Sequence, residues 1–446
     1  MKPVASFFLA LRYLTGRGER GGSRIRSAVL GVGISLIPLV VVLEISDGMI
    51  QGITDRFIEA GTYHLQAIHS PDVDQVELED AVERVSAVRG VTGVIPERRG
   101  MGLLSSERGR SGVTVRALPA DAWRRDEGLR RYITVREGEF DLSGERSVVL
   151  GQAVAEELSV SPGDAVRLLT VRPLENGAFL PRVSTFTVRG VISTGYQELD
   201  QLWLFMPLER GMRVLPPGSS RQILGVKIEE PYSLPNPLFA SGRGGEGRYL
   251  ANEIARRLGA EWRVFTWYEL ERSRYMSFRT TKNLLVFIMA LIVVVASVNI
   301  SSSLVMLVLE KQSEIAILKS TGASPKGVRR VFLYCGFFTG VLGAALGLAV
   351  GLAVAVNINA VLTGIEAVAD RLQGVLYLLL SPVFDDVPRS INVFHSEFYL
   401  ETIPISVEPV QLLAVAVLTM LLATVAALIP AYRAGATRPL EVMRRH

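Results

Sequence analysis

Cysteine and histidine are scarce in this chain of 446 residues, which contains one cysteine and four histidines. Cys335 lies inside a long apolar run, so we expect it to be a small buried side chain without a disulfide partner. The histidines are His64, His69, His395 and His446. They are scattered, without the spacing of neighbouring Cys/His ligands that is typical of zinc sites, so we predict no metal site.

The sequence also lacks the motifs of nucleotide and acyl-transfer enzymes. Lys319-Ser320 resembles the end of a phosphate-binding loop, but Glu314–Leu318 stands where that loop needs glycines. No Gly-x-Ser-x-Gly turn is present, and no histidine–aspartate pair stands near a nucleophile. We therefore predict a non-catalytic chain that binds no cofactor and no nucleic acid. Any work that it does must be driven by something else.

Charge is missing from long stretches of a chain that is 49% hydrophobic. Asn283–Leu309 and Val331–Ile365 contain no charged residue, and each is long enough to cross a bilayer. We predict four membrane-spanning helices, at 27–49, 282–309, 331–362 and 409–432. The first could instead be a cleaved signal peptide. Its apolar stretch exceeds a usual signal core and no cleavage site clearly follows, so we favour an uncleaved anchor.

Basic residues near the ends of these runs predict the orientation. Lysine and arginine gather in segments 1–26, 310–330 and 433–446, whereas 363–408 has two arginines against seven carboxylates. Because basic loops stay in the cytoplasm, we expect both termini inside, and segments 50–281 and 363–408 outside. This bias also accounts for the net charge of +4.

The predicted external segment 50–281 has short alternating strand and helix patterns without strict βαβ order, which indicates an α+β domain. Strands are predicted at Gly112–Leu118, Thr185–Ser193 and Gln222–Glu229. Helices are predicted at Gly151–Leu158 and Arg248–Leu258.

The charged segment Glu310–Ser324, between the second and third spans, has the signals of a helix with a defined end. Gly322 suits the left-handed position after a last helical residue. Ser324 can cap the next helix, and Pro325 suits that helix's first turn. A simple connecting loop would not need these signals.

Two features of the predicted spans concern substrate contact or packing. Glu44 and Asp47 are carboxylates near the outer end of span one, where charge is expensive and often functional, and Pro38 would kink or loosen that span. Alternatively, Glu44 simply reaches the outer interface. Span three carries glycines mostly four residues apart, which predicts a smooth face for helix packing; they are Gly336, Gly340, Gly343, Gly347 and Gly351.

One loop of the external domain is unusually apolar. Pro173–Pro181 presents Leu174, Phe179 and Leu180 between prolines. It is either a hairpin tip with chance apolar residues or an exposed finger that contacts a partner.

Several stretches resemble the FtsX/MacB-type permeases of ABC transporters, and most closely the lipoprotein-releasing permeases LolC and LolE. These stretches run along almost the whole chain and are Phe8–Leu14, Leu150–Ala155, Val160–Asp164, Phe186–Gly195 with Asp200, Val295–Ile300, Glu310–Ser324, Ile429–Ala434 and Arg438–Val442. The Glu310–Ser324 block is the most specific to this class.

The resemblance implies four spans, a MacB-like periplasmic core domain between the first two, and an inner-membrane location. It implies that Glu310–Ser324 is a coupling helix docked on a cytoplasmic LolD-like ATPase, which would bind the ATP and magnesium. Ile315 and Leu318 would share one contacting face. Polar contacts and the terminating turn would come from Glu310, Lys311, Glu314, Lys319 and Gly322.

The resemblance also implies a second permease copy, as a homodimer or a LolC/LolE-type heterodimer, a surrounding of membrane lipids, and a lipoprotein substrate passed to a LolA-like carrier. The Pro173–Pro181 loop corresponds to the carrier-contacting position. Glu44–Gly48 departs from the usual family ending of span one, and Glu366–Glu408 is longer than usual. Two alternatives remain: export of another amphiphile or signalling to an envelope hydrolase, and an envelope scaffold that uses no ATP.

Overall fold

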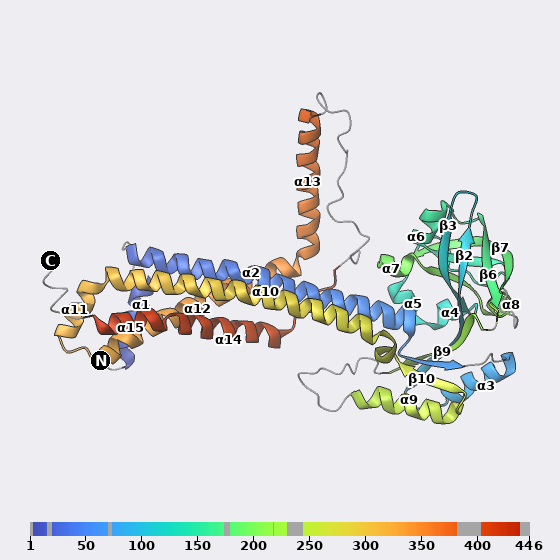
Figure 1. Ribbon diagram of the computed structural model, residues 1–446, viewed down its shortest axis with the longest axis horizontal. Helices are drawn as coiled ribbons and strands as arrows, with labels where there is room; N and C mark the ends of the chain where they lie inside the picture. The colour runs from blue at the N-terminus through green and yellow to red at the C-terminus, as the bar shows by residue number, and fades with distance from the viewer. Residues whose placement is uncertain are drawn as a thin grey trace. The chain divides into compact units, whose positions relative to one another are not determined.

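The computed structural model describes residues 3–15, 20–69, 74–173, 179–216, 218–229, 244–380 and 403–437 (Figure 1). The chain divides into two units. The helical unit comprises Met1–Met49, Ser277–Ser390 and Pro404–His446, and the sheet unit comprises Ile50–Met276 and Ile391–Ile403. The divisions at residues 49 and 276 fall inside α2 (Arg20–Arg56) and α10 (Trp267–Glu310), so each of these helices contributes to both units.

Four helices of the described residues are long and apolar enough to cross a membrane: Arg26–Thr62, Trp267–Glu310, Pro325–Val356 and Pro409–Ala436. The last comprises α14 (Pro409–Ala426) and α15 (Leu428–Ala436), separated by Ala427. Three of the predicted spans lie inside these helices, which extend beyond them.

The predicted third span, 331–362, is wrong at its outer end. Helix α12 (Pro325–Val356) stops at Asn357, and α13 (Ile358–Leu380) begins after it. The Asn357 side chain donates a hydrogen bond of 2.9 Å to the Ala353 carbonyl, a local bond that competes with regular helix geometry. An uncharged run does not reveal such a break. The predicted outer loop 363–408 accordingly begins as helix.

The predicted N-terminal segment 1–26 contains a helix, α1 (Pro3–Thr15), that packs on α12. Ser6 Oγ donates to the Gly327 carbonyl at 3.4 Å, and the Phe7 ring meets Tyr334 and Phe338 edge-on. The core of the helical unit gathers Leu36, Leu304, Phe332 and Ala423 from four different helices.

The sheet unit contains a sheet of ten strands among the described residues, in the order β10-β1-β9-β2-β3-β8-β5-β7-β4, with β6 pairing β2 and β7. The strands are β1 (Leu65–His69), β2 (Val91–Ser105), β3 (Arg110–Leu118), β4 (Thr134–Gly138), β5 (Ser147–Gly151), β6 (Ala165–Pro173), β7 (Phe179–Ser193), β8 (Trp203–Pro207), β9 (Ser220–Ile228) and β10 (Trp262–Thr266). Most pairs are antiparallel, and β3–β8 and β5–β7 are parallel.

Short helices accompany the sheet: η1 (Phe57–Thr62), α3 (Gln75–Ser86), α4 (Ala122–Arg125), α5 (Glu127–Tyr132), α6 (Gln152–Leu158), α7 (Gln197–Asp200), α8 (Leu208–Val214) and α9 (Gly244–Leu258). The α+β class is confirmed. The predicted strands lie along β3, β7 and β9, and the predicted helices match α6 and α9 to within a few residues. One apolar cluster gathers around Phe186 and another around Trp262.

Candidate functional site

The segment between α10 and α12 forms a separate helix, α11 (Gln312–Ser320). Gly322 follows it with φ of +99°, the left-handed conformation expected for it. Ser324 caps α12 by accepting a hydrogen bond of 3.2 Å from the Gly327 N–H, and Pro325 occupies the first turn. These three local predictions are confirmed, because each depends only on residues within a few positions.

One face of α11 packs against other parts of the chain. Ile315 and Ala316 are each 1% exposed, and Ile315 belongs to the core of the helical unit. Lys319 Nζ donates to the carbonyls of Gly435 and Thr437 at 2.9 and 2.6 Å. The prediction that Ile315 shares a partner-contacting face with Leu318 is therefore wrong for Ile315, since tertiary packing, which the local pattern does not show, turns it inward.

A polar cluster ties α11 to α1. Tyr13 Oη donates to Glu314 Oε2 at 3.2 Å, and Lys311 Nζ donates to Glu314 Oε1 at 2.6 Å. Burial, followed by the charge of Glu314, raises the pKa of Tyr13, so its phenol remains a hydrogen-bond donor. The polar groups of Lys311 and Glu314 are thus engaged within the chain, although the Glu314 side chain is still 48% exposed.

The opposite face of α11 points to solvent. We call it the α11 outer face; its exposed residues are Ser313, Glu314, Ile317, Ser320 and Thr321. Their spacing of three and four places them on one side of the helix. Ile317 is the large apolar side chain of this face and is 56% exposed. Sequence analysis missed Ile317, because the alternation of apolar and polar residues around it does not show which apolar side chain is buried in the core.

The glycine strip of α12 packs within the chain. A Cβ atom at Gly340 would lie 2.7 Å from the Ala423 Cβ, and one at Gly347 would lie 2.6 Å from the Leu36 Cβ. The contacts of the other three are Gly336 with Ala427 and Ala423, Gly343 with Val32, and Gly351 with Val40. The C-terminal helices therefore pack closely against one end of the strip, and α2 packs closely against the other end.

The outer part of α2 holds the carboxylates singled out from the sequence. Glu44 is 2% exposed, and its Oε2 atom has no hydrogen-bond partner among the described residues. Asp47 forms an ion pair with Lys282 of α10. Pro38 lies on the exposed side of α2, which continues through it as one helix. The structure thus places Glu44 inside the protein, not at an open interface.

The predicted partner-contacting loop begins on β6 and ends on β7, which pair with each other. Leu174 and the side chain of Phe179 lie outside the described residues, and Leu180 is 53% exposed. Other apolar side chains are exposed on the adjoining strands: Met101 (78%), Val183 (61%), Val171 (40%) and Leu103 (39%). Leu103 and Val183 both pair across strands with Leu169, so the apolar surface is continuous there.

A buried ionic network lies inside the sheet unit. Glu97 on β2 is 0% exposed and Arg116 on β3 is 1% exposed. The Arg116 guanidinium donates to both Glu97 oxygens at 2.8 Å, and Arg99 Nε donates to Glu97 at 2.7 Å. Burial alone would raise the pKa of Glu97, but the two arginines outweigh it and hold this pKa well below its usual range.

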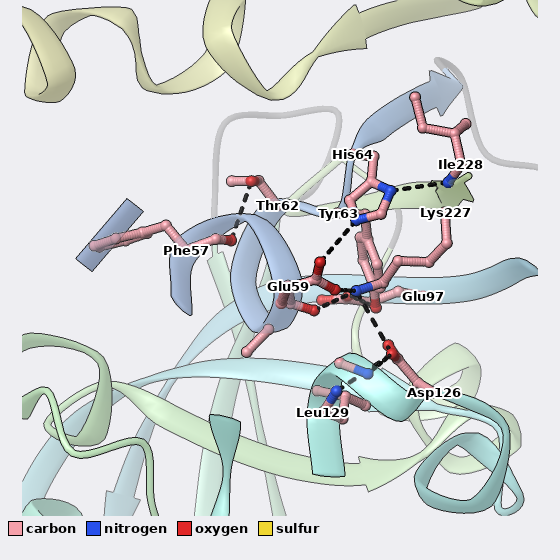
Figure 2. A network of polar contacts seen from close by, with 12 residues as sticks. Phe57, Glu59, Thr62, Tyr63, His64, Glu97, Asp126, Leu129, Lys227 and Ile228 are labelled. Atoms are coloured by element: carbon pink, nitrogen blue, oxygen red, sulfur yellow. Dashed lines mark hydrogen bonds and ion pairs between the residues drawn. The ribbon is translucent and has the colours of Figure 1, made fainter. Parts of the chain in front are cut away.

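The same network reaches the π-helix η1 (Figure 2). His64 Nδ1 accepts the Ile228 N–H at 2.8 Å, so His64 Nε2 carries the proton that it donates to Glu59 at 3.0 Å. Lys227 donates to the Glu59 carboxylate and carbonyl, each at 2.6 Å, and lies 3.5 Å from Asp126. Sequence analysis missed this network. Its signal is a charged residue inside an apolar strand, such as Arg116 between Val115 and Ala117.

Comparisons with known proteins match two parts of the chain. Residues 27–235 match the family described as MacB-like periplasmic core domain, and residues 286–439 match FtsX-like permease C-terminal. The chain is 25% identical over 442 residues to the lipoprotein-releasing system transmembrane protein LolC of Xylella fastidiosa, covering 98% of each. It is 23% identical to the corresponding LolE of Haemophilus influenzae, covering 99% of each.

A solved structure, the periplasmic region of MacB from Actinobacillus actinomycetemcomitans, aligns with 48% of this chain and 92% of its own, with 12% identity and a TM-score of 0.29.

Proposed function

We propose that this chain, which belongs to the FtsX/MacB-type permeases of ABC transporters, extracts lipoproteins from the bacterial inner membrane for transfer to a periplasmic carrier. The family carries no catalytic site in this subunit, so ATP hydrolysis is assigned to a separate ATPase. The observation that carries the proposal is α11: its inner face packs within the chain, while Ser313 and Ile317 on its outer face are exposed.

The α11 outer face is the proposed ATPase contact. In protein interfaces a few anchor side chains contribute most of the binding energy, and weaker contacts around them exclude water. Ile317 supplies that anchor, and Ser313 and Ser320 supply the polar surroundings. This assignment replaces Ile315 and keeps α11 as the element through which ATP-driven closure of the partner moves the permease. The basic segments beside it support a cytoplasmic location, with both termini inside.

Ile317→Asp tests this contact. We expect ATPase binding to weaken roughly 30-fold, corresponding to about 2 kcal/mol for an interface anchor. The measurement is ATPase co-purification and lipoprotein-stimulated ATP turnover in nanodiscs. Val76→Asp is the matched control, because Val76 is 76% exposed and lies in the sheet unit. Normal binding by a folded Ile317→Asp chain would remove α11 from the proposed interface.

Two further surfaces receive roles in the same proposal. The outer part of α2, with Pro38, Glu44 and Asp47, is where the substrate enters from the membrane; a photo-crosslinker at the exposed Pro38 position should capture a lipidated peptide. The apolar surface of the β6–β7 hairpin, including Leu180, contacts the carrier. A crosslinker at Leu180 that captures no periplasmic protein during transfer would exclude this contact.

Purification from native membranes tests the function as a whole. We expect mass spectrometry to identify an ABC ATPase, a second permease copy or a paired permease, and a lipidated protein. An ATPase without any lipoprotein would favour export of another amphiphile. Recovery of neither ATPase nor lipoprotein would overturn the proposal in favour of an ATP-independent scaffold.

A further inference from the structure

A cluster in the sheet unit brings one imidazole together with two carboxylates. His69 is the last residue of β1, Glu77 lies in the first turn of α3, and Glu261 immediately precedes β10. His69 Nε2 is 3.3 Å from Glu261 Oε2 and 4.0 Å from Glu77 Oε1. All three ligand atoms lie within 4.8 Å of one another.

We propose that His69, Glu77 and Glu261 bind a divalent transition-metal ion, for which zinc is the best match. Imidazole nitrogen with carboxylate oxygens is a donor set that suits zinc. With a neutral imidazole the three groups carry two negative charges, which a divalent cation balances. Three protein ligands would leave one position of a tetrahedral ion for water.

The different exposure of the three side chains fits this role. The His69 side chain is only 3% exposed, and its ring packs edge-on to Trp262 at 4.8 Å, so it is a fixed ligand. The side chains of Glu77 and Glu261 are 43% and 71% exposed. Donors of tetrahedral zinc lie about 3.3 Å apart, so these two carboxylates need to move by only about 1 Å.

The ion would join three elements that are separated in the chain. β1 pairs with both β9 and β10, whereas β10 is an end strand of the sheet, and His69 stands opposite Trp262 in the register. A metal here would fasten the edge strand β10, which leads directly into α10, to β1 and α3. Sequence spacing did not reveal the set, because His69 and Glu261 are 192 positions apart.

Zinc binding by the full-length chain tests the proposal. The chain is purified in nanodiscs without a polyhistidine tag, stripped with a chelator and dialysed against buffered zinc. We expect one zinc per chain and a rise in the thermal unfolding midpoint, because the ion binds only the folded state. In Glu261→Gln we expect at least about tenfold weaker binding, the lower limit for disturbing a metal site. His69→Gln should lose the ion.

Glu79→Gln is the matched control, since Glu79 is an exposed carboxylate on the same helix and lies outside the cluster. Glu261→Gln keeps the test valid if His69→Gln fails to fold, because it changes an exposed side chain without altering its shape. The proposal is overturned if the folded wild-type chain binds no zinc at micromolar free concentration. Equal zinc binding by wild type and Glu261→Gln would overturn it as well.

Discussion

The interiors of the two units of this chain are stabilised by different means. The sheet unit buries full charges and neutralises them internally, as Glu97 is held by Arg116 and Arg99. The helical unit instead brings backbones close, with glycines of α12 against Leu36 and Ala423. In water, apolar burial drives folding strongly enough to carry a costly ion pair, whereas helices in lipid must gain their association from close packing.

The largest expected effect comes from unbalancing the buried charges. Glu97→Gln leaves the Arg116 guanidinium without its counter-charge, so we expect the sheet unit to lose roughly 3–5 kcal/mol of unfolding free energy. The measurement is chemical unfolding of the full chain followed by tryptophan fluorescence, since Trp203 lies 4.7 Å from the Arg116 guanidinium. The double variant Glu97→Met/Arg116→Met is the control and should be closer to wild type. Equal losses in both variants would show that packing volume, and not charge balance, determines this core.

The corresponding change in the helical unit is Gly347→Val. Its new side chain would overlap the Leu36 side chain and the Gly33 carbonyl, so we expect a loss of about 1–3 kcal/mol from overpacking. Thermal unfolding in nanodiscs measures it. Gly31→Val is the control, because no atom lies within 4 Å of a Cβ at Gly31. If Gly347→Val were as stable as the control, close packing of α12 on α2 would not be what holds this unit.

Acid should distinguish the two cores. In the folded chain the pKa of Glu97 lies below its ordinary value of 4.5. Under acid conditions Glu97 therefore binds a proton in the unfolded chain but stays ionised in the folded chain. The unfolding free energy should therefore fall as the pH drops below about 4.5, by up to about 1.4 kcal/mol per pH unit. Glu97→Met/Arg116→Met should lack this contribution. A pH dependence identical in both chains would assign it to other carboxylates.

Helix caps give the smallest effect and should be alike in both units. Asp74 accepts the Glu77 N–H at 2.8 Å at the start of α3, and Ser324 accepts the Gly327 N–H at 3.2 Å at the start of α12. Asp74→Ala and Ser324→Ala should each cost about 1 kcal/mol in thermal unfolding. Ser219→Ala, an exposed position outside any helix, is a suitable control. A much larger loss at one cap would show that this cap has a second role.

The sequence was sufficient wherever the cause is local. Charge-free length predicts three of the spans. Gly322 marks the end of α11, and Ser324 and Pro325 mark the start of α12, because left-handed backbone and capping depend on immediate neighbours. The end of α12 at Asn357 was not predictable from the absence of charge. Alternating polarity also predicted the strands along β3 and β7.

What depends on distant partners could not be predicted in this way. Ile315 and Ile317 are the same residue type two positions apart, yet packing against the rest of the helical unit buries the first and exposes the second. Arg116 has no counter-charge among its neighbours in the chain, since its partner lies on β2, 19 residues earlier. The same holds for His69 and Glu261, which only the strand pairing brings together.

The two faces of α11 separate two kinds of evolutionary freedom. Substitutions of Ile315 or Lys319 must remain compatible with this permease's own core and C-terminal helix. Substitutions of Ser313 or Ile317 meet no such demand from within the chain and, under the proposed contact, can follow changes in the ATPase. Under the proposed contact, a new ATPase partner requires changes on only one side of a nine-residue helix. Chimeric transporters made by transplanting only that side would keep the fold of the recipient permease.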